Sequence, residues 1–246
     1  MRLFLILFLV LSTVLATEIK QKVTVGAGPY IQTQPYKGVD NILLVSPVVF
    51  FDNSLFYVRW SRVGVYFLGE SNDKYSWGFS LTAQPRVYGY KASDIKGMDE
   101  RKNSLEGGLA FGAKKENSHI EIMLLTDILH NQHSWILQNK IGYDFKIGNF
   151  SFYPSLIAIY QSSSFTDYYY GVKKSEELSS AYKYYSPNGG LQIGMQTYIN
   201  YPITTKLSTL INLRIDRLSN QASNSPIVAD NYIYSGLASL IYTFEY

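Results

Sequence analysis

The sequence predicts an all-β fold, a transmembrane antiparallel up-and-down β-barrel of about 12 strands. The first observation is that apolar residues recur at every second position along most of the chain, as in strands with one face on lipid. The second is the excess of aromatic residues, 22 Tyr, 13 Phe and 3 Trp among 246 residues, because aromatic side chains form girdles at both bilayer interfaces. The mean hydropathy of -0.06 excludes a helical membrane protein, which needs long apolar segments.

Residues 1–16 are predicted to be a signal peptide. Met1-Arg2 gives a short positive start, Leu3 to Leu15 is almost entirely apolar, and Val14-Leu15-Ala16 has the small-residue pattern of a cleavage site. A single membrane anchor is the alternative, but the apolar run is shorter than the roughly 20 residues of a spanning helix. We therefore expect residues 17–246 to form one outer-membrane barrel. The chain has no cysteine, which excludes a lipoprotein and any reliance on disulfides.

Segments in which apolar and polar residues alternate are distributed over the whole predicted barrel. Most are long enough for a tilted spanning strand of about 9–11 residues. They are residues 23–32, 76–87, 104–111, 119–124, 135–147, 191–201, 207–216 and 232–246. Between residues 54 and 70, one long apolar run requires a turn near Trp60-Ser61-Arg62 to give two strands.

The last alternating segment continues up to the final residue of the chain. Tyr242, Phe244 and Tyr246 complete its apolar row, and such a row is typical of the closing strand of an outer-membrane barrel. We expect these three residues to form the C-terminal signal that the barrel assembly machinery recognises.

The connections between the predicted strands alternate between short and long. The short ones are Asp52-Asn53, Lys115 to Asn117, Gly148-Asn149 and Pro202 to Thr205. The long, polar ones are Thr33 to Asp40, Lys91 to Lys102, Ser162 to Pro187 and Ser219 to Asp230. Outer-membrane barrels have short turns in the periplasm and long loops outside. With both termini in the periplasm, the number of strands must be even.

Charged residues on the polar face of the strands are predicted to point into the lumen. They are Arg86, Glu106, Glu121, Lys140, Asp144, Lys146, Arg214 and Asp216. Both signs occur in similar numbers, so we expect a network of paired charges that fills a small barrel rather than a wide pore. A path for a ligand or solute along these charges is the alternative.

Enzymatic and metal-binding functions have little support in the sequence. His130 and His133 form an H-x-x-H pair, but no cysteine or acidic cluster flanks it, so a solvated loop is favoured over a metal site. His119 lies beside Glu121 on the polar face, where a His-Glu pair would be able to support a nucleophile. A hydrogen-bonded histidine in the lumen is the favoured interpretation. We therefore assign no catalytic, cofactor-binding or metal-binding residues and expect no cofactor.

Several motifs resemble those of the MipA/OmpV family and follow the family's order through nearly the whole mature chain. They are Gly26-Ala27-Gly28, Pro35 to Asp40, Val45 to Val49 with Asp52, Gly97-Met98-Asp99 with Leu105 to Gly108, Tyr169 to Val172, and Ser225 to Val228. The family is named for a protein that interacts with a murein-degrading lytic transglycosylase. The resemblance implies an outer-membrane protein that acts as a scaffold between murein hydrolase and murein synthase. Other members are described as outer-membrane antigens or adhesins, and the family brings no catalytic residues.

The favoured function is therefore a non-enzymatic, structural or scaffolding barrel in the bacterial outer membrane. The alternatives are a small-solute channel or transporter with a charged lumen, and an adhesin or antigen. The expected partners are outer-membrane lipid and lipopolysaccharide, the barrel assembly machinery, and periplasmic murein enzymes. Exposed aromatics at Tyr168 to Tyr170 would be able to contact a partner or lipopolysaccharide, but a place in the interfacial aromatic girdle is the favoured interpretation. The net charge of +3 is dispersed along the chain, so nucleic acid is not an expected partner.

Overall fold

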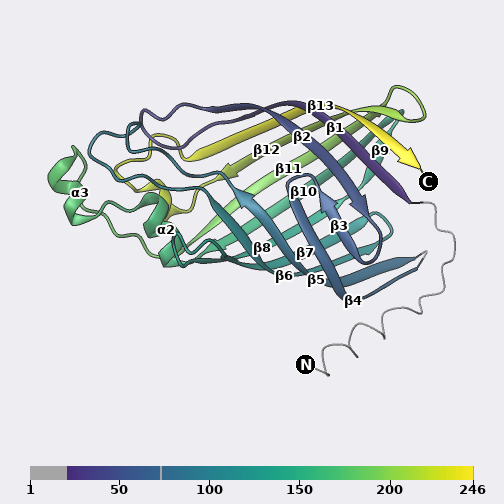
Figure 1. Ribbon diagram of the computed structural model, residues 1–246, viewed down its shortest axis with the longest axis horizontal. Coiled ribbons are helices and arrows are strands. Elements are labelled where there is room, and N and C mark those ends of the chain that lie inside the picture. The colour runs from purple at the N-terminus through teal and green to yellow at the C-terminus, as the bar shows by residue number, and fades with distance from the viewer. Residues whose placement is uncertain (1–20, 73, 246) are drawn as a thin grey trace, which may run out of the picture.

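The strands form one antiparallel sheet that closes into a barrel (Figure 1). The computed structural model describes residues 21–72 and 74–245, so the predicted signal peptide and Tyr246 lie outside the described residues. The strands are β1 (Lys22–Gln32), β2 (Ile42–Asp52), β3 (Phe56–Arg59), β4 (Arg62–Ser71), β5 (Tyr75–Arg86), β6 (Ser104–Lys115), β7 (Ser118–Asp127), β8 (Trp135–Tyr143), β9 (Phe145–Ile147), β10 (Phe150–Gln161), β11 (Gly190–Pro202), β12 (Leu207–Arg217) and β13 (Tyr232–Glu245). The connections contain the helices α2 (Ser163–Tyr170), α3 (Lys174–Ser179) and α4 (Asn220–Ser223).

Closure of the sheet depends on the pairing of the first strand with the last. β1 pairs with β13 from Lys22 opposite Glu245 to Gln32 opposite Ser235. β8 and β9 both pair with β10 and are separated by Asp144 alone, so they are two parts of one strand. The thirteen strand segments therefore make twelve strands around the barrel, which confirms the predicted architecture.

The exposure of alternate residues shows which face of the wall meets the membrane. On β11, Leu191, Ile193 and Met195 are 54%, 46% and 59% exposed, whereas Gln192 between them is fully buried. A soluble sheet would bury its apolar row and expose its polar row. The reversed pattern places the apolar row on lipid and the polar row in the lumen.

The two ends of the barrel differ in their connections (Figure 1). The helices α2 and α3 lie at one end, and β1 begins and β13 ends at the other. Glu116-Asn117 joins β6 to β7, and Gly148-Asn149 joins β9 to β10, in tight turns where Glu116 and Gly148 have φ of 53° and 57°. Because outer-membrane barrels have short periplasmic turns, the helical end is the external one. Among residues 21–72 and 74–245, none of the helices is long and apolar enough to span a membrane.

The apolar run between residues 54 and 70 divides at the predicted turn, but into unequal strands. Trp60-Ser61 separates the four residues of β3 from the ten of β4, and Trp60 has a φ of 57°. β3 pairs with β2 only at Phe50, Phe51 and Asp52. The β3–β4 hairpin therefore ends part of the way up the wall, which the apolar pattern did not indicate.

The interior contains an apolar core as well as charged residues. Inward-facing apolar side chains on β7, β8 and β10 are almost fully buried: Met123, Leu125, Ile136, Ile157 and Ile159. They belong to one cluster with aromatic residues of the external loops, including Tyr36, Phe165, Tyr169 and Tyr170. Tyr169 and Tyr170 are fully buried, so the prediction that they are exposed is wrong, because α2 packs them against the other loops. The external loops thus fold back onto the barrel and bury apolar surface inside its mouth.

We predict that a side chain at Gly28 prevents closure between β1 and β13. A Cβ there would overlap the carbonyl oxygen of Ala238 and the Cα of Ser239, both of them backbone atoms. Gly28→Ala should therefore reduce the folded fraction, measured as the heat-modifiable band in a gel of outer-membrane extracts. The control is Gly112→Ala on β6, where a Cβ would meet no atom within 4 Å. Equal folded fractions for the two variants would contradict the prediction.

Candidate functional site

The external mouth of the barrel is closed by a cap of packed aromatic side chains from different loops. The ring of Tyr36 lies 4.8 Å from that of Tyr90 and 5.7 Å from that of Tyr170. Tyr169 packs 4.9 Å from Phe165 within α2. Aromatic pairs at these distances add to the free energy gained from burial alone, by about 0.5–1.5 kcal/mol each.

Burial raises the pKa of several cap tyrosines. The pKa of Tyr169 is raised to about 12, chiefly by burial. Burial is also the main reason that the pKa values of Tyr36 and Tyr170 are well above the ordinary value. These phenols therefore remain neutral in the folded cap at pH values where they would ionise in an unfolded chain.

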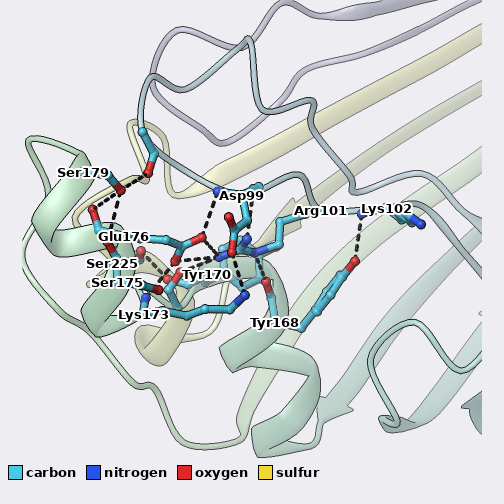
Figure 2. A network of polar contacts seen from close by, with 12 residues as sticks. Asp99, Arg101, Lys102, Tyr168, Tyr170, Lys173, Ser175, Glu176, Ser179 and Ser225 are labelled. Atoms are coloured by element: carbon cyan, nitrogen blue, oxygen red, sulfur yellow. Dashed lines mark hydrogen bonds and ion pairs between the residues drawn. The ribbon is translucent and has the colours of Figure 1, made fainter.

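A buried ion pair connects two of the loops that form the cap (Figure 2). Arg101, in the loop after β5, donates from Nη2 to Glu176 Oε1 at 2.8 Å and to Oε2 at 3.0 Å, and each side chain is 2% exposed. Arg101 Nε also donates to the carbonyl oxygen of Tyr168 at 2.5 Å. The guanidinium thus holds α2 and α3 against the loop of residues 87–103.

Glu176 also orders the backbone around this ion pair. Its Oε1 accepts from the N–H of Asp99 at 3.0 Å, and its Oε2 accepts from the N–H of Lys173 at 2.7 Å. The side chain of Lys173 in turn donates to Asp99 Oδ2 at 2.8 Å, and this hydrogen bond lowers the pKa of Asp99. These contacts join the external loops to one another. The cap is therefore an ordered structure and not a loose set of loops.

Two of the predicted lumen charges form a buried pair below the cap. Arg86 on β5 donates through Nε and Nη2 to the two carboxylate oxygens of Glu106 on β6, the second at 2.8 Å. Both side chains are almost fully buried. A bidentate arginine–carboxylate pair of this kind compensates the cost of burying the two charges.

A second pair lies on β12. Arg214 donates from Nε and Nη2 to Asp216 at 2.6 and 2.8 Å. Asp216 Oδ1 also accepts from Gln192, and Gln192 accepts from Gln161, so the pair continues across β11 to β10.

The largest group of lumen charges surrounds Glu121 on β7. Arg62 donates to its carboxylate from Nη1 at 2.7 Å and from Nη2 at 2.5 Å. Arg59 Nη1 lies 3.3 Å from Oε1, and Lys140 Nζ lies 3.2 Å from Oε2. Arg59 also contacts Asp52 at 2.7 Å. Three cations thus share two carboxylates, and the group has one excess positive charge.

A cavity of about 580 Å³ lies beside this group in the periplasmic half of the lumen. Its lining includes Lys22 and Asp52, at the periplasmic ends of β1 and β2. Its wall has two chemistries. The cationic side chains are Lys22, Arg59, Arg62, Lys140 and Arg214, and the aromatic side chains include Phe50, Trp60 and Tyr198.

The remaining predicted residues lie near the periplasmic end. Asp144 contacts Lys114 at 2.7 Å, and Lys114 is not one of the cations that surround Glu121. Lys146 is exposed on β9. Tyr242 and Phe244 are 37% and 49% exposed on the outer face of β13, with their rings 4.7 Å apart. The structure thus places the predicted charges in separate pairs and one larger group, and not in one continuous network.

His119 lies between a serine and a carboxylate, in the order of a catalytic triad. Its Nε2 is 3.4 Å from Ser155 Oγ, and its Nδ1 is 3.3 Å from Asp144 Oδ1. However, Asp144 Oδ1 accepts no hydrogen bond, so the carboxylate does not fix the imidazole as a triad requires. We therefore assign no catalysis to these residues.

The external histidines also form no metal site in the described part of the chain. The rings of His130 and His133 are 5.6 Å apart. Among residues 21–72 and 74–245, no group of three or more His, Cys, Asp or Glu side chains is arranged to hold a metal ion.

The sequence did not predict the partners that complete both the cap and the Glu121 group. Arg59 and Arg62 flank the β3–β4 turn, and their inward direction depends on where that turn falls. Arg101 and Glu176 are distant in sequence and lie in loops without periodicity. The G-x-D motif at Gly97 to Asp99 was the one signal close to them, because it marks an ordered loop.

Fold and site together define a class, the bacterial outer-membrane β-barrels. The model of the family described as MltA-interacting protein MipA matches residues 25–244. The chain belongs to this family. It is 25% identical over 230 residues to the MltA-interacting protein of Escherichia coli K12, with 92% of this chain and 90% of that protein covered. The outer membrane protein OmpV of Vibrio cholerae is 26% identical over 163 residues, 66% of this chain and 63% of that protein.

A similar solved structure is that of an outer membrane channel from Pseudomonas putida F1. The match has a TM-score of 0.47 and 12% sequence identity, and it covers 95% of this chain and 98% of that chain. The family membership and the names of the relatives place this protein in the outer membrane.

We predict that the buried ion pair keeps the cap resistant to protease. Glu176→Gln leaves Arg101 buried without its counter-charge, and removing one partner of a buried pair costs about 3–5 kcal/mol. Cleavage within residues 162–189 of the purified barrel should therefore become faster. The control is Glu177→Gln on the exposed side of α3, which should be cleaved like the parent. Equal resistance of both variants would show that the pair does not hold the cap.

We also predict that the cap loses stability at alkaline pH. A free tyrosine ionises near pH 10, whereas Tyr169 has a pKa raised to about 12. Because the folded pKa is the higher one, this contribution to stability is complete below pH 10 and is lost as the pH rises from 10 to 12. Absorbance at 295 nm should show a class of tyrosines that titrates late, together with faster proteolysis of the cap. A single titration near pH 10 would contradict this.

Proposed function

We propose that this protein is a non-enzymatic scaffold of the cell envelope that binds a periplasmic protein at its periplasmic rim. The expected partner is a murein-processing enzyme, because a relative is named MltA-interacting protein. The observation that carries the proposal is the asymmetry of the barrel. The external mouth is filled by the cap, whereas the cavity of about 580 Å³ lies toward the periplasmic end.

The periplasmic turns provide the surface that such a partner would contact. Leu55, in the turn between β2 and β3, is 58% exposed, and Ile203, in the turn after β11, is 49% exposed. Exposed apolar side chains at turn tips are suited to contact with a protein. The turns are short, so we expect a small interface near the roughly 1,200 Å² lower limit of standard interfaces. Binding should then be weak and transient.

The packing of the interior favours this function over a solute channel. A diffusing solute would have to pass the cap, the Arg86–Glu106 pair and the Glu121 group. Opening such a path means separating buried charges, and each broken pair costs about 3–5 kcal/mol. Purified protein in planar bilayers should therefore show no steady conductance.

Site-specific crosslinking in cells tests the scaffold. Photoreactive residues at Asn117 and Thr204, in two periplasmic turns, should each trap a periplasmic protein that is identified by mass spectrometry. The matched control is Asn188, an exposed position in the external loop after α3, which should trap no periplasmic protein. If neither turn traps a partner and the purified protein conducts ions, the scaffold proposal is wrong and the channel replaces it.

A further inference from the structure

The barrel wall has an interruption in its external half, directly above the β3–β4 hairpin. β2 pairs with β1 over residues 42–51, but its other edge pairs with β3 only at residues 50–52. The last contact on that edge is the N–H of Trp60 donating to the carbonyl oxygen of Val49 at 2.8 Å. Residues 42–48 of β2 therefore have no strand beside them on the side of β5.

A proline lies just beyond the hairpin on each of the two unpaired edges, that of β2 and that of β5. The backbone groups of Val49 point toward the hairpin. Pro47 is two residues away, so its backbone groups point to the same side of the strand. On β5, Pro85 is opposite Leu105, whose carbonyl oxygen accepts from Ile128 on the far side of β6. Pro85 therefore faces the interruption as well. Because proline has no N–H, the two edges are unable to join by regular pairing.

The exposure of β2 agrees with an opening. Leu43 and Val45, on the outer face, are 74% and 75% exposed, more than Leu191 or Ile193 in the continuous wall of β11. Leu44 between them points inward and is nevertheless 45% exposed. Unpaired backbone groups at membrane depth are tolerated only where they line a cavity or are buried in protein. The unpaired edge of β2 is therefore expected to line a cavity and not to lie directly against lipid.

An apolar cluster inside the lumen lies next to this opening. Val48, Leu210, Leu237 and Ile241 are buried there, together with the rings of Tyr30, Phe50, Trp60 and Tyr198. Trp60, at the tip of the hairpin, donates from its indole N–H to Ser46 Oγ on β2 at 2.9 Å. Its ring is 5.6 Å from that of Tyr30 and 6.5 Å from that of Tyr198. An apolar surface thus extends from the opening into the lumen.

The same aromatic side chains also line the periplasmic cavity. Phe50, Trp60 and Tyr198 form one part of its wall, and the cationic side chains around Glu121 form another. The excess positive charge of that group is unmatched by the two carboxylates within it, so an additional anion would be stabilised there. The cavity and the opening together are complementary to a molecule with an anionic head and an apolar chain.

We propose that the lumen binds a single-chain anionic amphiphile that reaches it through the opening between β2 and β5. The carboxylate or phosphate of the amphiphile contacts Arg59 and Lys140, and its chain lies on Trp60 and continues into the outer leaflet. A β-strand of a partner or a second copy is a poorer occupant, because Pro47 and Pro85 remove donors at the positions where pairing would begin.

Tryptophan fluorescence tests the opening. The variant Trp77→Phe/Trp135→Phe keeps Trp60 as the one tryptophan of the chain. In bilayers of phospholipid brominated on the acyl chains, Trp60 should be quenched. The control adds Trp60→Phe and Leu125→Trp, which places the indole at an inward, fully buried position of the continuous wall. If Trp60 is quenched no more than the indole of the control, acyl chains do not enter and the proposal is wrong.

A titration in detergent tests the anionic head. A fatty acid brominated on its chain should quench Trp60 saturably, and the uncharged alcohol of the same chain length should bind at least tenfold more weakly. Arg59→Gln should weaken binding of the fatty acid by about tenfold, which corresponds to 1.4 kcal/mol. Lys114→Gln, a half-exposed cation outside the cavity, should leave binding unchanged. Equal binding of acid and alcohol, or of the parent and Arg59→Gln, would overturn the assignment of the head. Neither experiment depends on a periplasmic partner.

Discussion

The constraint on which this structure depends is that backbone N–H and C=O groups have no water to bind inside a bilayer. Each unsatisfied group costs several kcal/mol there, so a sheet must close on itself. The pairing of β1 with β13 achieves this closure, and glycine at Gly28 lets the two backbones approach. The interruption above the β3–β4 hairpin is the exception, because residues 42–48 of β2 pair with β1 but have no strand on their other side.

Closure creates an interior that has to be filled, and two different kinds of side chain fill it in this barrel. The external half is filled by apolar and aromatic side chains that the loops bring back onto the barrel. The periplasmic half holds paired charges around Glu121 and the cavity beside them. A carboxylate bound by an arginine fork recurs at both levels, in Arg86 with Glu106 and in Arg62 with Glu121. This geometry satisfies several donors at once and makes the buried charges tolerable.

The asymmetric filling makes the two ends of the barrel different. A closed outer face and an accessible periplasmic end suit a protein that works toward the periplasm, and the family to which the chain belongs has a member named for such an interaction. The proposed opening between β2 and β5 would add a second connection, sideways into the membrane. The two proposed ligands, a membrane amphiphile and a periplasmic protein, would then bind at different surfaces, without a path across the membrane.

The sequence by itself determined the class, the number of strands, the faces of β5, β11 and β13 and the position of the turn at Trp60, because strand alternation and turns are local properties of the chain. It also identified Arg86, Glu106, Glu121 and Lys140 as residues of the polar face. Only the tertiary structure decided which charges meet, because the shear of the barrel sets which residues of distant strands lie at the same height along the barrel axis. The Arg101–Glu176 pair, the apolar filling and the interruption beside Pro47 depend on contacts between segments far apart in sequence. No local pattern encodes such contacts, so they became visible only when the sheet had closed.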